Sequence, residues 1–141
     1  MGPRSATQML QLPVQLHGIR LGRTVDLLLA ATDWRVLGFV VRCGDESQRF
    51  LVHATAEPRD AEIAVPSALL LLEPVEFYRR RSRSFRELLG SAVLCDGREV
   101  GELRDLLVGS DGLVESLVVE WGGTRREVEA AGARIESVSR V

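Results

Sequence analysis

The sequence predicts an all-β protein built from two tandem copies of one small β-barrel. The first observation is an internal repeat, because segment 17–29 returns at 96–108. The second is a series of short apolar segments separated by glycine-containing turns at roughly ten-residue spacing, which is typical of sandwiches and barrels. The third is size, since half of 141 residues is too small to bury a large core alone. We therefore expect the copies to pack on each other or on a partner.

The repeat aligns equivalent positions without a gap. Gly22 corresponds to Gly101, a shift of 79 positions. After one inserted residue, the match continues at a shift of 78 between segments 36–44 and 114–122. Self-similarity at a fixed shift indicates that each copy is one structural unit.

The elements are clearest in the second copy. After a short apolar run at 92–95, we expect strands at 100–108, 113–121 and 125–128. Turn-forming pairs separate them, such as Asp96-Gly97 and Gly122-Gly123. The expected organisation is an N-terminal tail (1–12), a first barrel (13–77), a linker (78–90) and a second barrel (91–141).

The long strand of each copy has two different faces. Alternation with period two places Leu117, Val119 and Trp121 on one side, which we expect to be the barrel interior. The opposite faces are half apolar, so we expect the sister copy or a second chain, as in a homodimer, to cover them. The residues of this predicted apolar interface are Val36, Val40, Val114 and Val118. Trp34, in a turn, either contacts a partner or packs over the barrel mouth.

The linker is rich in arginine. Five arginines lie within eight residues, at Arg79, Arg80, Arg81, Arg83 and Arg86. One interpretation is a solvated connector that the fold does not need. The other is an anion-binding patch for RNA, acidic lipid or an acidic protein surface.

Composition limits the remaining functions. Net charge is −2, so a general nucleic-acid binder, which usually has a clear basic excess, is not favoured. Cys43 and Cys95 have no paired spacing, which argues against a zinc site or a disulfide framework. No apolar run approaches the length of a membrane span or of a signal peptide core. We expect a cytoplasmic protein.

Candidate catalytic and metal-binding groups are sparse. His17 and His53 lack ligand spacing, and they are not equivalent in the two copies. Asp26 and Asp105 are equivalent, but no histidine or second carboxylate accompanies them, so we expect turn or cross-strand hydrogen bonds. Serine-nucleophile, phosphate-loop and dinucleotide motifs do not occur. The sequence predicts no enzyme, metal or cofactor.

Both copies carry the pattern Gly-x-x-(Leu/Val)-Gly-x-x-x-Asp-Leu-Leu-(Leu/Val), at 18–29 and 97–108, followed by Val-x-x-(Leu/Phe)-Val-Val. This pattern resembles the PRC-barrel family, the small β-barrel of the photosynthetic reaction centre H subunit and the ribosome maturation factor. Segment 63–69, with its Val-Pro pair, is similar to a late strand of that family. The second copy has no proline at 129–138, which leaves the closure of its barrel open.

The resemblance implies a non-enzymatic adaptor that docks on a larger protein assembly, either membrane-associated or ribosomal. It brings no catalytic residues with it. The alternative is an RNA- or ribosome-associated factor that contacts phosphates through the segment 79–86. A membrane-associated partner would place this otherwise cytoplasmic protein at the periphery of a membrane.

Overall fold

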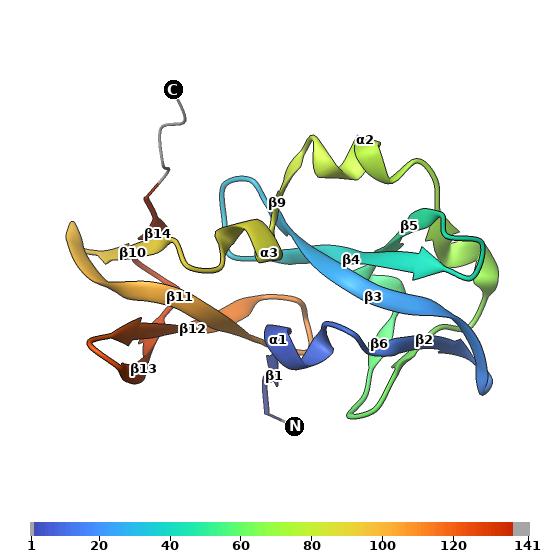
Figure 1. Ribbon diagram of the computed structural model, residues 1–141, viewed down its shortest axis with the longest axis horizontal. Coiled ribbons are helices and arrows are strands. Elements are labelled where there is room, and N and C mark those ends of the chain that lie inside the picture. The colour runs from blue at the N-terminus through green and yellow to red at the C-terminus, as the bar shows by residue number, and fades with distance from the viewer. Residues whose placement is uncertain (1, 137–141) are drawn as a thin grey trace.

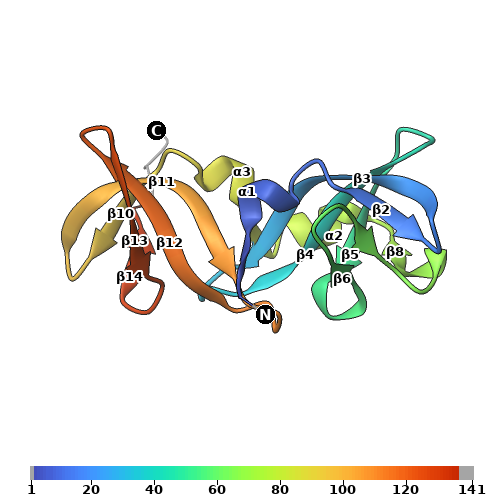
Figure 2. The same cartoon turned by 90° about the horizontal axis from the view of Figure 1, so that it is seen from below.

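The computed structural model describes residues 2–136, and they form the all-β fold that the sequence predicts. Strands dominate, and the α-helices in this range are three short ones, of four or five residues each. The strands belong to two sheets that lie side by side along the long axis of the molecule (Figures 1 and 2).

The first sheet consists mainly of the first copy. Its strands are β2 (Pro13–Leu16), β3 (Ile19–Ala30), β4 (Val36–Cys43), β5 (Gln48–Val52), β6 (Glu57–Pro58), β7 (Ile63–Ala64), β8 (Leu71–Leu72) and β9 (Ser82–Ser84). Their order is β6-β7-β2-β3-β4-β5-β8, and β9 pairs with β3. Helix α2 (Val75–Arg79) and the 3₁₀ turns η1 (His53–Thr55) and η2 (Ala68–Leu70) complete this half.

The second sheet consists mainly of the second copy. Its strands are β1 (Arg4–Ser5), β10 (Ala92–Cys95), β11 (Arg98–Val108), β12 (Val114–Trp121), β13 (Thr124–Glu129) and β14 (Ala133–Ile135). Their order is β13-β12-β11-β10-β14, and β1 pairs with β11. The strands expected in this copy are confirmed. Within residues 2–136 neither strand path pairs its first strand with its last, so two closed barrels remain a prediction; residues 137–141 lie outside the described chain.

A glycine of the repeat allows two strands of each sheet to approach closely. A Cβ atom on Gly22 would lie 2.5 Å from the carbonyl oxygen of Arg42 on β4. At the equivalent Gly101, with φ of +140°, a Cβ atom would lie 2.6 Å from the carbonyl oxygen of Glu120 on β12. Only glycine fits these positions without moving backbone, which explains why both copies keep it.

The N-terminal tail and the linker each contribute a strand to the sheet of the copy that they do not directly precede. Strand β1 and helix α1 (Ala6–Met9) precede the first copy, yet β1 pairs with β11 of the second. Strand β9 and helix α3 (Phe85–Leu88) precede the second copy, yet β9 pairs with β3 of the first. Both helices therefore lie in the middle of the molecule, between the sheets (Figures 1 and 2). We call segments 4–9 and 82–88 the exchanged segments.

A pseudo-two-fold relation connects the halves. The N–H of Val36 donates to the carbonyl of Gly112 at 2.8 Å, and the N–H of Val114 donates to the carbonyl of Trp34 at 2.9 Å. These bonds are each other's counterparts at the repeat shift of 78, and they flank a bridge between Arg35 and Leu113. One continuous core of buried side chains includes residues of both copies. The copies pack on each other, as expected.

Candidate functional sites

The repeated aspartates anchor the exchanged segments. Asp26 is 4% exposed, and its Oδ2 accepts a hydrogen bond from the hydroxyl of Ser84. Its Oδ1 accepts the backbone N–H of Arg86 at 3.1 Å and that of Leu27 at 2.8 Å. Ser84 is also the N-cap of α3, because its Oγ accepts the N–H of Glu87 at 3.3 Å. Asp26 thus holds β9 and α3 on the first sheet.

Asp105 does the same for the other exchanged segment. It accepts the hydroxyl of Ser5 on Oδ2, and its Oδ1 accepts the N–H of Thr7 at 2.9 Å and that of Leu106 at 2.8 Å. Ser5 caps α1 through the N–H of Gln8. These contacts confirm hydrogen-bonding roles for both aspartates. The sequence contains a signal for the equivalence of the two anchoring serines. The pair Arg4-Ser5 recurs as Arg83-Ser84 at the repeat shift of 79.

Arg83 is built into the junction between the copies. Its Nε donates to the carbonyl of Ala30 at 2.9 Å, and its Nη2 donates to the carbonyl of Asp33 at 2.8 Å. The guanidinium also lies over the ring of Trp34, 4.9 Å from its centroid. Burial lowers the pKa of Arg83, although the arginine stays charged at neutral pH.

Most of the other linker arginines have partners within the chain as well. Arg79 donates to Gln48 at 3.0 Å and lies 3.9 Å from the Asp26 carboxylate. Arg81 donates to the carbonyl of Phe77 and stacks over its ring at 4.0 Å. Arg86 donates to the carbonyl of Val25 at 3.0 Å, whereas Arg80 is exposed. The linker is therefore folded rather than a solvated connector, because four of its five arginines contact oxygen atoms or aromatic rings of the chain.

The chain itself covers most of the predicted apolar interface. Val36 and Val114 are buried in the shared core where the copies meet. Val40 is fully buried in a separate cluster that includes Val75 of α2, so a helix covers it rather than the sister copy. Val118, its equivalent on the second sheet, is half-buried. Three of these valines are thus unable to contact a partner without opening the fold.

The two tryptophans have different environments. Trp34 is half-buried, and its indole N–H donates to the carbonyl of Ala133 at 2.8 Å across the junction, which favours packing over partner contact. Trp121 was expected in a barrel interior with Leu117 and Val119, which are buried. It is instead 60% exposed, because it is the last residue of β12 and lies beyond the core.

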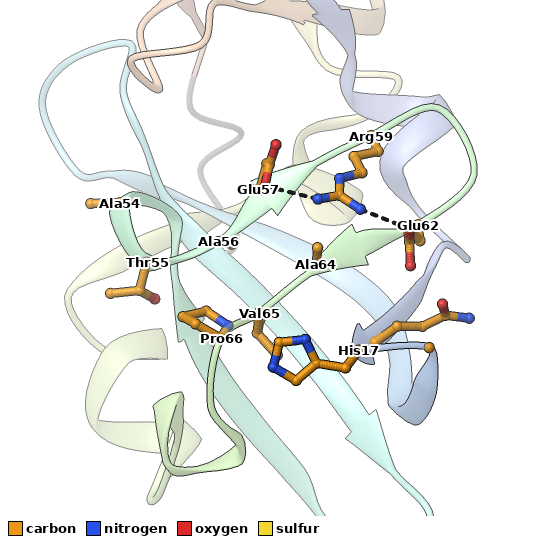
Figure 3. A pocket seen from close by; sticks show the side chains of 12 residues that line it. His17, Ala54, Thr55, Ala56, Glu57, Arg59, Glu62, Ala64, Val65 and Pro66 are labelled. Carbon is orange, nitrogen blue, oxygen red and sulfur yellow. Dashed lines mark hydrogen bonds and ion pairs between the residues drawn. The ribbon is translucent and has the colours of Figure 1, made fainter.

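A shallow hollow of about 450 Å³ lies beside β6 and β7 (Figure 3). Arg59 reaches between two carboxylates there, at 3.1 Å from Glu57 and 3.3 Å from Glu62. His17 stands at its rim, and the rest of its wall is mainly small apolar side chains. Both carboxylates already pair with the one arginine, and the three side chains together carry a net charge of about −1, so the described residues of this hollow offer no free cation to an anionic ligand.

The outer edge of the second sheet is the better candidate for docking. Strand β13 ends the sheet path, and its side chains are exposed except for Val128, which is half-buried. A hollow of about 420 Å³ adjoins it, with Val100, Trp121 and Thr124 in its wall. The equivalent strand of the first sheet, β5, is covered by β8 and α2. Within residues 2–136 no strand covers β13 in the same way.

No family model and no curated protein sequence matches this chain. Residues 2–136 contain no cluster of three or more histidine, cysteine, aspartate or glutamate side chains arranged to hold a metal ion. None of the helices in that range has the length and apolar character needed to cross a membrane.

Proposed function

We propose that this protein is a docking module of the PRC-barrel type that binds a larger protein assembly without catalysing a reaction. The repeated glycine and aspartate motif supports the assignment, because each of its residues has a structural task in both sheets. The residues that recur in both copies therefore stabilise the fold, and we expect a partner to bind at positions where the two copies differ.

The main support for this proposal is the open edge of the second sheet at β13. An uncovered edge strand presents unpaired backbone N–H and C=O groups that another chain can extend as a new strand. Trp121 at 60% exposure supplies an apolar anchor next to this edge. We infer that the partner contributes an extended segment with an apolar side chain that contacts Trp121.

The test is affinity capture from the source cell with the Trp121→Ser variant. The matched control is Leu69→Ser, which removes another exposed apolar side chain, 87% exposed in the first half. Neither change should lower stability, so both variants should melt like the parent. A partner retained by the parent and the control but lost by Trp121→Ser supports the proposal. Identical partners for all three chains contradict it.

The alternative, an RNA-associated factor acting through Arg79–Arg86, has less support. Four of these five arginines donate hydrogen bonds to other parts of the chain. Arg83 in particular contacts two carbonyls and the ring of Trp34, which leaves it fewer N–H groups for phosphate.

A further inference from the structure

A basic hollow of about 510 Å³ lies on the first sheet, away from the proposed docking edge. Four arginines line it, Arg20 and Arg23 from β3, Arg42 from β4 and Arg86 from α3. No carboxylate from the described residues is in its lining. Four positive charges around one concave surface create a field that attracts anions.

Two of these arginines stand in an unfavourable position. Arg23 and Arg42 are directly opposite each other on the paired strands β3 and β4. Like charges in directly opposed positions destabilise an antiparallel pair. Such a violation of an ordinary folding rule is expected where a function requires it.

The second sheet shows how the same scaffold resolves a like-charge pair. There the equivalent residues are Glu102 and Glu120, again directly opposed. Arg104 bridges the two carboxylates, with Nη2 at 2.9 Å from Glu102 and 3.3 Å from Glu120. The hydrogen bond from Arg125 and the charge of Arg104 lower the pKa of Glu120, so its charge is compensated inside the chain.

Among residues 2–136, no side chain supplies this counter-ion in the first sheet. The repeat shift of 79 places Val25 where the second sheet has Arg104, and Val25 lines the basic hollow. The charge at the equivalent positions of the second sheet has the opposite sign, because they carry Glu99, Glu102 and Glu120. The backbone of the repeat therefore does not require arginine at these positions. The arginine pair is thus left without the opposite charge that its counterpart has.

Two of the guanidinium groups are already oriented toward the site. Arg23 donates one N–H to the carbonyl of Gln11 at 3.0 Å, and Arg86 donates one to the carbonyl of Val25 at 3.0 Å. Each guanidinium has five N–H groups, so several remain for an external anion. Arg20 and Arg42 are exposed and can close on a ligand from solvent.

We propose that this hollow binds a compact, multiply charged phosphate compound, whose oxygens take the place that an internal counter-ion takes in the second sheet. Arginine matches phosphate through paired N–H donors, and four of them suit more than one phosphate group. The concave form favours a small polyphosphate over an extended strand, which would need a longer basic track. This inference does not depend on docking at β13.

The test is calorimetric titration with inorganic tripolyphosphate at low ionic strength, for the parent, Arg42→Gln and Val25→Glu. Arg42→Gln should weaken binding by about tenfold or more. Val25→Glu should abolish binding by supplying the missing carboxylate. Arg125→Gln, which removes one exposed arginine from the second sheet, is the control and should bind like the parent.

Each outcome decides the proposal. The parent should also melt at a higher temperature with tripolyphosphate present, and Arg42→Gln should show a smaller rise. If the parent does not bind, or if Arg125→Gln loses as much affinity as Arg42→Gln, the proposal is overturned. A single-stranded RNA decamer serves as the second ligand, and binding of RNA but not tripolyphosphate also overturns it. Should Val25→Glu fail to fold, Arg42→Gln and the control still decide.

Discussion

The anchoring of the exchanged segments makes a quantitative prediction for Asp26→Ala. This substitution removes the acceptor of three hydrogen bonds, from Ser84, Arg86 and Leu27. It also removes the carboxylate beside Arg79. Hydrogen bonds to a charged group contribute roughly 1.5–3 kcal/mol each, but they are not additive, and water can replace some of them. Because Asp26 is buried, we expect a loss of about 3–5 kcal/mol in the free energy of unfolding.

The second sheet provides the comparison. Asp105 makes the equivalent bonds but is only half-buried, so Asp105→Ala should cost less, about 1–3 kcal/mol. Glu99→Ala, an exposed change on β11, should stay within about 0.5 kcal/mol of the parent. Urea unfolding followed by far-ultraviolet circular dichroism measures all three.

A double-mutant cycle identifies the partner. Asp26→Ala combined with Ser84→Ala should destabilise less than the sum of the two single changes, because both remove the same bond. Additive losses, or an Asp26→Ala variant within about 1 kcal/mol of the parent, would refute the anchoring role of Asp26.

Three further predictions concern the backbone, the linker and pH. Gly101→Ala should lower stability by about 2 kcal/mol or more in urea unfolding, since its Cβ atom would meet strand β12; a parent-like midpoint contradicts this. Arg83→Gln should lower the melting temperature while Arg80→Gln leaves it unchanged, and equal melting of the two would show that the Arg83 contacts do not matter. Burial lowers the pKa of His53, so the unfolded chain binds the proton more readily and stability should fall as pH drops below about 6.5. His53→Gln should reduce this pH dependence in unfolding titrations between pH 7.5 and about 5, and an unchanged slope would exclude His53 as its source.

The sequence by itself determined the all-β class and much of the local structure. Turn chemistry at Asp96-Gly97 depends only on adjacent residues, and both have positive φ as a two-residue hairpin turn requires. Alternation along 114–121 predicted that Leu117 and Val119 are buried, but it wrongly placed Trp121 with them. The shift of 79 predicted two equivalent units, because equal sequences with equal turns fold alike.

Only the tertiary structure decided which segments pair. In the sequence, residues 4–9 and 82–88 look like a tail and a linker because each segment is short. Ser5 bonds to Asp105, about a hundred residues away, and Ser84 bonds to Asp26, about sixty residues away. Local periodicity contains no information on a partner that distant. The contacts of Arg83 and Arg86 could not be predicted for the same reason, since their acceptors are backbone carbonyls that no residue type reveals. The contrast between Val25 and Arg104 became meaningful only when strand register placed Arg23 opposite Arg42.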